Sequence, residues 1–395
     1  MTASRHAGAH RPYDVIVIGL GAMGSATLHA LARSGRRVLG VDRFAPPHAF
    51  GSSHGRTRII RAAYFENPGY VPLVRRSYDL WRELQRQAGT TLYVKTRGLS
   101  IGPEDGALVS GARASAEAFR IPHRVLSAAG VQRQFPGLQP LDTMIGVLDE
   151  HAGTLFPERC IAALLATARK NGAELHLEDP IVGWEADGTI VRVRTPNAEY
   201  AGQQLVIAGG AWMRQLVPEL AGVLSVRRQP SYWFEPASRP EEFRPERCPV
   251  TLWEYAPGRV FYTLPDFGDG LKVAVHHEGN VVDPDRVARE TSAEEDARVT
   301  DLLRRFLPHA KGHIRESQVC LYTNTPDRDF IIDVHPAHPQ QVVVVSACSG
   351  HGFKFATVVG EIAAELLATG TSQHEVSMFT MGRFEAAGQP GSESV

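Results

Sequence analysis

The sequence predicts an α/β fold with an α+β insert, and three observations lead to this prediction. A buried strand, a glycine-rich turn, a helix and a second strand follow one another within residues 13–42. Several antiparallel strand candidates are grouped within residues 223–317. The chain then returns to a strand of parallel type at residues 341–347. A parallel sheet interrupted by a discontinuous antiparallel-sheet domain accounts for this order.

The composition narrows the class of protein. The 395 residues predict two or three domains, with a core that needs no disulfide or metal to hold it. The 42 basic and 43 acidic residues nearly cancel, and no apolar run reaches about 18 residues. We therefore expect no nucleic-acid partner, no membrane span and no metal site. The four cysteines form no C-x-x-C pair and the first residues lack a secretory pattern, which predicts a cytoplasmic location.

The first structured segment predicts a dinucleotide-binding βαβ unit. The run YDVIVI at residues 13–18 is typical of a buried parallel strand, and Gly19, Gly21 and Gly24 follow it in G-x-G-x-x-G spacing. Gly19 permits a tight turn, Gly21 lets a pyrophosphate approach the backbone, and Gly24 allows close packing of helix and strand. Asp42 ends the next strand, 23 residues after Gly19, where it would accept a hydrogen bond from an adenosine ribose.

The motif alone does not separate NAD from FAD. A helix is expected to start near Phe353, directly after the last parallel strand. The positive end of that helix would stabilise negative charge on a reduced flavin, which favours FAD and a Rossmann-type FAD-binding domain.

The remaining elements follow from periodicity. Helices are predicted near residues 70–85, 161–171, 293–306 and 353–369. Strands are predicted at residues 174–177, 190–194 and 204–210, and in the antiparallel run at SYWFEP, VTLWEY, RVFYTLP and LKVAVHH.

We divide the chain into three parts on this basis. Residues 1–11 are expected to form a flexible tail. The FAD-binding domain is expected to combine residues 12–92, 150–222 and 318–388. The substrate domain is expected to combine residues 93–149 and 223–317.

Lysine is scarce, with five residues against 37 arginines, so each lysine is informative. Lys272 lies in the apolar strand LKVAVHH, where a buried ammonium is costly unless it serves a purpose. Lys272 and His276 are four residues apart and share a face of this strand. Alternation predicts that His277 points to the opposite face, toward solvent.

Four segments together resemble the monomeric sarcosine oxidase family, to which N-methyltryptophan oxidase belongs. They are GSSHGRTRIIRAAY, LKVAVHHEGNVVDPD, VCLYTNTPDRDFIIDVHP and SGHGFKFATVVGE, and the resemblance extends from about Tyr13 to Phe384. It implies an FAD-dependent amine oxidase of N-methyl or secondary amino acids, of the sarcosine or N-methyltryptophan type. Oxidative demethylation with oxygen as acceptor would give the amino acid, formaldehyde and hydrogen peroxide. The resemblance also implies a monomer.

The resemblance also implies roles for individual residues. Cys320 would carry FAD covalently through a thioether to the flavin 8α-methyl group. Lys272 would promote the reaction of reduced flavin with oxygen, beside the active-site residue His276. Arg61 and Lys354 would hold the substrate carboxylate. The other residues implied at the flavin or substrate are Thr57, Arg58, Tyr262, Tyr322, Gly350, His351 and Gly352.

The sequence departs from the family pattern at three places. Ser53 stands where the family often has a histidine, Arg56 replaces an acidic residue, and Ala274-Val275 replaces a Gly-Tyr or similar pair. These changes affect the flavin surroundings and the pocket wall, so the substrate side chain stays open. Alternatives are an oxidase of cyclic or bulky secondary amino acids such as pipecolate or fructosyl amino acids, a flavin dehydrogenase using a protein acceptor, and a non-catalytic flavin-binding regulator.

Overall fold

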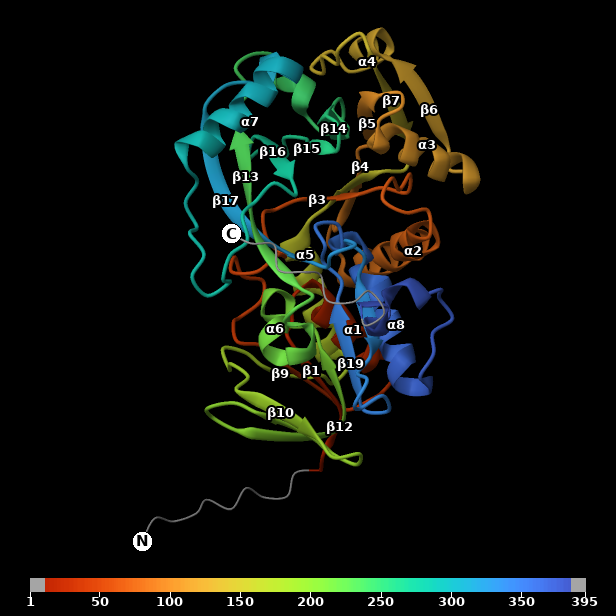
Figure 1. Cartoon of the computed structure of the whole chain (residues 1–395), viewed down its shortest axis with the longest axis vertical. Helices are drawn as coiled ribbons and strands as arrows, with labels where there is room; N and C mark the ends of the chain where they lie inside the picture. Colours follow the sequence, from red (N-terminus) through yellow and green to blue (C-terminus); the bar gives the residue numbers. More distant parts are fainter. Residues whose placement is uncertain (1–10, 385–395) are drawn as a thin grey trace.

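The computed structural model describes residues 11–384 and contains two eight-stranded sheets, one above the other in Figure 1. Of the tail predicted at residues 1–11, all but Arg11 lies outside the described residues, as do residues 385–388 of the predicted FAD-binding domain.

The lower sheet confirms the predicted βαβ unit. Strand β1 pairs in parallel with β2 on one side and with β12 on the other, and β12 also pairs in parallel with β19. The strand order is β10-β11-β12-β1-β2-β9, with β19 alongside β12 and β18 beyond β19. The bounds are β1 (Tyr13–Ile18), β2 (Val38–Val41), β9 (Glu174–His176), β10 (Gly183–Ala186), β11 (Val191–Arg194), β12 (Glu199–Ile207), β18 (Ile331–Val334) and β19 (Val342–Ser346).

Strand β12 differs from its predicted range at both ends. The strand expected at residues 204–210 begins at Glu199 and ends at Ile207. It ends early because Gly210 has a φ of 56° and starts a short 3₁₀ turn, which an extended strand cannot accommodate.

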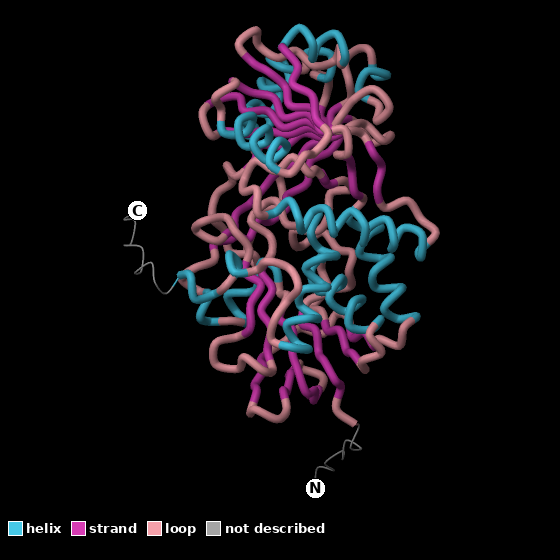
Figure 2. Tube along the Cα trace, turned by 90° about the vertical axis from the view of Figure 1, so that its right-hand side faces the viewer, coloured by secondary structure: helices cyan, strands magenta, loops and turns pink. Residues whose placement is uncertain are grey.

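Helices pack on this sheet and on one another. Helix α1 packs against both α5 and α8, and Figure 2 shows most of the lower helices gathered on one side of the strands. The bounds are α1 (Ala22–Arg33), α2 (Tyr70–Ala88), α5 (Pro157–Lys170), α6 (Met213–Leu216) and α8 (Ala356–Thr369). Gly360 allows the close approach of α8 to α1, because a Cβ there would lie 2.5 Å from the Ala26 backbone.

The upper sheet has the order β17-β13-β16-β15-β14-β5-β7-β6. Its pairs are antiparallel apart from β14 and β5, which come from separate segments of the chain and run parallel. The bounds are β5 (Gly98–Pro103), β6 (His123–Ser127), β7 (Met144–Asp149), β13 (Ser225–Phe234), β14 (Val250–Ala256), β15 (Arg259–Leu264), β16 (Leu271–His276) and β17 (Ile314–Asn324).

Helices α3 (Ala107–Ala118), α4 (Ala128–Gln134) and α7 (Ala293–Phe306) accompany the upper sheet. Helix α7 has the predicted bounds, and its start is defined by a capping box between Ser292 and Glu295. Seven 3₁₀ turns complete the description: Gly210–Trp212, Pro218–Leu220, Pro240–Phe243, Pro308–Ala310, Phe353–Phe355, Ser377–Phe379 and Met381–Phe384.

A third, three-stranded sheet is formed by β3 (Arg58–Ile60), β8 (Gly153–Leu155) and β4 (Tyr93–Lys95). Strand β17 belongs to the upper sheet over its whole length and so crosses the boundary predicted between residues 317 and 318. The division into two domains stays a prediction.

Two further findings bear on the sequence-based expectations. None of the helices within residues 11–384 is long and apolar enough to cross a membrane. All four cysteines, which lie inside the described range, carry free thiols. The expected cytoplasmic location stays a prediction.

Candidate active site

A cavity of about 690 Å³ brings the predicted site residues together from both large sheets. Gly24 is the one predicted residue that does not line it. The others on its wall are Gly19, Gly21, Asp42, Thr57, Arg58, Arg61, Tyr262, Lys272, His276, Cys320, Tyr322, Gly350, His351, Gly352 and Lys354.

The glycine-rich turn leaves one end of the cavity open at the start of α1. A Cβ on Gly24 would lie 1.6 Å from the Gly19 carbonyl oxygen, so Gly24 allows the helix to pack on the turn. A Cβ on Gly21 would meet nothing closer than Ser53 Oγ at 3.6 Å. The helix N-terminus therefore faces free space in which a phosphate group can approach backbone N–H groups.

Asp42 is held at the edge of this space. Its two carboxylate oxygens accept hydrogen bonds from the backbone N–H groups of Leu20 (2.6 Å) and Phe44 (2.8 Å). Burial raises the pKa of the carboxyl group, and these two bonds act in the opposite direction. Each oxygen keeps a lone pair that a ribose hydroxyl could use.

The upper sheet supplies the opposite wall because its register places the functional side chains on one face. Lys272 on β16 is paired with Trp233 on β13, and Tyr262 on β15 is paired with Ala274. Cys320 on β17 is paired with Gln229, which shares a face with Trp233 by alternation. Lys272, His276, Tyr262, Cys320 and Tyr322 therefore all project toward the same cavity.

Lys272 is 1 % exposed, which excludes a solvent-facing edge position. Its Nζ donates to the carbonyl oxygens of Gly55 (2.5 Å) and Thr57 (3.1 Å). Burial, followed by the neighbouring Arg58, lowers the pKa of Lys272 to about 7. A Cβ on Gly55 would lie 3.1 Å from Lys272 Nζ, so glycine at this position allows the ammonium to approach the loop.

The Cys320 thiol lies among cationic groups. Its Sγ is 3.5 Å from Arg58 Nη2 and 3.8 Å from His54 Nδ1. Burial alone would raise the pKa of the thiol, but His54 and Arg58 outweigh it, and the pKa falls to about 6. Cys320 is therefore largely thiolate at neutral pH, the nucleophilic form. In contrast, burial raises the pKa of Cys248 to about 12.

Arg61 and Lys354 lie against the same aromatic ring. Arg61 Cζ is 4.4 Å and Lys354 Nζ is 5.1 Å from the centre of the Tyr64 ring. Arg61 Nη2 also donates to both carboxylate oxygens of Glu66, each at 2.6 Å. Burial, followed by Arg61, lowers the pKa of Lys354 to about 7. Arg61 and Lys354 therefore lie next to one aromatic ring, and the Glu66 carboxylate already occupies Arg61.

The histidines of the cavity are held by tyrosines. Tyr64 Oη bonds His351 Nδ1, and Tyr322 Oη lies 3.3 Å from His276 Nδ1. Burial lowers the pKa of His351 to about 4, and burial together with His277 holds that of His276 well below its usual value. Both histidines are therefore neutral at physiological pH.

The expectation that His277 faces solvent was wrong. Strand β16 ends at His276, and His277 has a φ of 64°, so the alternation of strand side chains stops before it. The His277 ring lies 4.0 Å from the His276 ring and 5.4 Å from the Tyr322 ring, centre to centre. His277 therefore packs behind the residues of the cavity wall.

Sequence reasoning missed four residues of the site: Tyr64, Glu66, His54 and Trp233. Tyr64 and Glu66 follow Arg61 within five residues, but no local pattern indicates that they turn back onto its side chain. Trp233 could have been found only from the register that pairs it with Lys272.

The cavity wall carries buried polar atoms suited to a large polar cofactor. Within residues 11–384, the side-chain atoms on it without a hydrogen-bond partner include Ser52 Oγ, Thr57 Oγ1, Gln229 Oε1 and Ser346 Oγ. Buried polar atoms are costly when unpaired, so they indicate a bound group with several donors and acceptors. Together with the glycine turn and Asp42, they fit a flavin dinucleotide.

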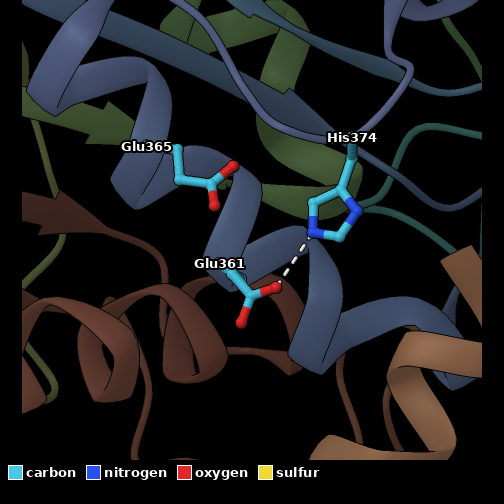
Figure 3. Close-up of side chains that lie close together, drawn as sticks. All are labelled: Glu361, Glu365 and His374. Carbon is cyan, nitrogen blue, oxygen red and sulfur yellow. Dashed lines mark hydrogen bonds and ion pairs between the residues drawn. The ribbon is translucent and has the colours of Figure 1, made fainter.

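A separate group with ligand-type side chains lies on α8 and on the segment after it, and none of its members lines the cavity. Glu361, Glu365 and His374 place one potential ligand atom each within 4.8 Å of one another, and Figure 3 shows His374 bonded to Glu361. Glu361 also receives two hydrogen bonds from Arg76, and Glu365 binds residues 372–373. These oxygens tie the segment after α8 to the helices, so we do not assign a metal to them.

The parallel strands with their glycine-rich turn, and a large cavity that carries unpaired polar atoms, define a dinucleotide-dependent enzyme. In agreement, residues 14–366 match the DAO family, described as FAD dependent oxidoreductase. The chain is 43% identical to the monomeric sarcosine oxidase of Streptomyces avermitilis over 378 residues, 95% of this chain and 98% of that protein. It is 34% identical to N-methyl-L-tryptophan oxidase of Yersinia pestis over 94% of this chain and 99% of that protein. The chain belongs to this family of FAD-dependent oxidoreductases.

Solved structures agree on the fold. The open form of NikD, an amino acid oxidase of nikkomycin biosynthesis, has a TM-score of 0.82 at 24% identity and covers 94% of this chain and 98% of its own. Glycine oxidase from Geobacillus kaustophilus has a TM-score of 0.79 at 18% identity, covering 95% of this chain and 99% of its own. These likenesses show the fold alone.

Proposed function

We propose that this enzyme oxidises N-methyl amino acids of the sarcosine or N-methyltryptophan type, with oxygen as electron acceptor. A secondary amine R–NH–CH₃, water and oxygen would give R–NH₂, formaldehyde and hydrogen peroxide. The names of the relatives support N-methyl amino acids as the substrate class. The cations on the cavity wall support a substrate that has a carboxylate, as an amino acid does.

One observation carries the proposal: Arg61 and Lys354 converge on Tyr64 inside a cavity that also holds Lys272. A guanidinium can bind a carboxylate through two hydrogen bonds and an ammonium adds a point charge, so the pair suits the carboxylate of a free amino acid. Glu66 holds Arg61 when no substrate is bound, and a substrate carboxylate would exchange with it or share the guanidinium.

FAD supplies the redox chemistry when bound, accepting a hydride equivalent from the carbon next to nitrogen and passing electrons to oxygen. Gly19, Gly21 and Asp42 would hold its dinucleotide part. Thr57, Arg58, Gly350, His351 and Gly352 would contact the remainder. No side chain is needed as a base if the amine binds uncharged, and the neutral His276, with Tyr262 and Tyr322, forms a wall that disfavours a charged amine.

The finer parts of the proposal are covalent attachment and assembly. We infer that Cys320 bonds the flavin 8α-methyl group, because its thiolate lies on the cavity wall among His54, Arg58 and Lys272. We also propose a monomer in the cytoplasm, in keeping with four free thiols.

The test is a peroxide assay with a panel of amines. Sarcosine, N-methyltryptophan, pipecolate, proline and a fructosyl amino acid are each mixed with the enzyme in air, and peroxide and formaldehyde are measured. The proposal expects both products from an N-methyl amino acid. If only the cyclic amines give peroxide, the enzyme is an oxidase of cyclic secondary amino acids instead. Flavin reduction by an amine without peroxide would indicate a dehydrogenase, and no reduction by any amine would indicate a flavin-binding regulator.

Covalent attachment predicts that flavin stays with the protein after precipitation with acid. Cys320→Ser should release it into the supernatant, because a neutral hydroxyl is a far weaker nucleophile than a thiolate. The control is Cys248→Ser, whose thiol is buried away from the cavity and whose pKa is raised. Absorbance of the pellet and supernatant decides the result. Flavin lost from the unmodified enzyme would contradict the bond.

A further inference from the structure

The loop that approaches Lys272 contains a strained turn. The backbone N–H of Thr57 donates to the carbonyl oxygen of Gly55 at 2.7 Å, which closes a γ-turn around Arg56. Arg56 has a φ of 64°, a conformation that a side chain disfavours. A strained turn of this kind persists only where surrounding contacts hold it.

Two strands and a helix supply such contacts to Arg56, in addition to Asp269 Oδ1, which lies 3.8 Å from Arg56 Nη1. Its guanidinium pairs with Glu316 on β17. Its backbone N–H donates to Glu158 Oε1 on α5 at 3.0 Å. Its Cζ lies 4.8 Å from the centre of the Trp233 ring on β13, within the range of a cation–π contact. Arg56 is therefore attached to both the lower and the upper part of the molecule.

Lys272 is attached to the same structures. The two carbonyl oxygens that it binds belong to the residues on either side of Arg56, Gly55 and Thr57. Its Nζ lies 5.1 Å from the centre of the Trp233 ring, its direct partner in the sheet register. Any change in the turn around Arg56 would therefore move both acceptors of the Lys272 ammonium.

We propose that Arg56 is a positioning residue for Lys272. Held by Glu316, Glu158 and Trp233, it fixes the strained turn whose carbonyl oxygens hold the Lys272 ammonium at the cavity. This positioning role goes beyond the proposed oxidase activity. It rests on that activity in one respect, which is that Lys272 takes part in the reaction with oxygen.

A test must separate the effect of the turn geometry on Lys272 from the effect of the Arg56 charge. The charged and titratable groups that face Lys272 are Arg58, Cys320, Glu158 and Arg56. Arg56→Ala and Arg56→Gly remove the same charge and the same contacts. They differ because glycine adopts a positive φ without strain, whereas alanine does not. Glycine should therefore retain the turn that alanine releases.

The measurement is the titration of Lys272 in the holoenzyme by NMR of ¹³Cε-labelled lysine. The chain has five lysines, and the signal missing in Lys272→Met identifies Lys272. Hydrogen bonds to the charged form favour it, so losing two carbonyl acceptors lowers the proton affinity. We expect Lys272 to titrate about one pH unit lower in Arg56→Ala than in Arg56→Gly, a roughly tenfold difference.

Arg120→Ala and Arg120→Gly form the matched control pair, because Arg120 is an exposed arginine with a φ of 51° at the end of α3. Both should leave the Lys272 titration as in the unmodified enzyme. Equal titration in the two Arg56 variants would overturn the proposal. If Arg56→Ala does not fold, Arg56→Ser replaces it, because serine also disfavours a positive φ and carries no charge. Lys272 should again titrate lower in Arg56→Ser than in Arg56→Gly, and equal values would overturn the proposal.

The rate of reoxidation by oxygen shows whether a failure concerns the positioning role of Arg56 or the proposed role of Lys272. At a pH well above both Lys272 midpoints, reoxidation in stopped flow should be about tenfold slower in Arg56→Ala than in Arg56→Gly, because the protonated fraction of Lys272 then differs by about tenfold. If Lys272→Met reoxidises at the normal rate while the Arg56 variants still differ by NMR, the positioning role holds and the role of Lys272 in oxygen chemistry fails.

Discussion

Replacing Lys272 by methionine is expected to slow reoxidation of the reduced enzyme by oxygen roughly a thousandfold, with little effect on folding. Lys272 is a buried cation inside the cavity, and its charge lowers the cost of adding an electron to oxygen. Losing about 4 kcal/mol of this stabilisation gives the stated factor. Methionine matches the length and the apolar surroundings of the side chain, so the strand should remain packed. Stopped-flow mixing of reduced enzyme with oxygen measures the rate.

The same residue predicts a pH dependence. Burial, followed by Arg58, lowers the pKa of Lys272 to about 7. The ammonium form is therefore lost as the pH rises through about 7, and reoxidation of the unmodified enzyme should slow over this range. Lys272→Met should show no such slope. The control is Lys170→Met, at the exposed end of α5. An unchanged rate in Lys272→Met would assign the oxygen reaction to another group.

Removing either cation at the Tyr64 end of the cavity is expected to weaken amino-acid binding ten- to a hundredfold. Losing one partner of a charge-assisted hydrogen bond costs about 1.5–3 kcal/mol. Arg61→Ala and Lys354→Ala should each show this loss for amino acids, and a much smaller loss for matching amines without a carboxylate. The concentration dependence of anaerobic flavin reduction measures it.

Glu66 provides a second test of this prediction, because its carboxylate already binds Arg61 and would compete with the substrate carboxylate. In Glu66→Gln the guanidinium keeps a neutral partner of the same shape, so a substrate carboxylate meets less competition. We expect Glu66→Gln to bind amino acids more tightly, the opposite of Arg61→Ala. Equal losses for amino acids and for amines in Arg61→Ala and Lys354→Ala would mean that these residues support the flavin or the fold.

Local patterns determined much of the architecture. The strand, turn and helix at residues 13–42 and the bounds of α7 follow from short-range periodicity and capping, which act within a few residues. Alternation along β16 was sufficient to place Lys272 and His276 on one face. The same rule failed at His277, because a positive φ ended the strand, and a single sequence contains no signal for that backbone angle.

The site itself needed both sequence and tertiary structure. The motifs identified Cys320, Arg61 and Lys354, but the surroundings that set their charge come from residues far away in the chain. Arg56 and Glu316 are 260 residues apart, and Tyr64 and His351 are 287 apart. Side-chain pairing over such separations depends on sheet register and on the packing of loops against a second sheet, neither of which leaves a local pattern. The sequence by itself therefore determined the fold class, and it predicted a set of site residues that the structure places around one cavity. The tertiary structure alone decided that Glu66 holds Arg61, that His54 and Arg58 lower the pKa of Cys320, and that the turn around Arg56 accepts hydrogen bonds from Lys272.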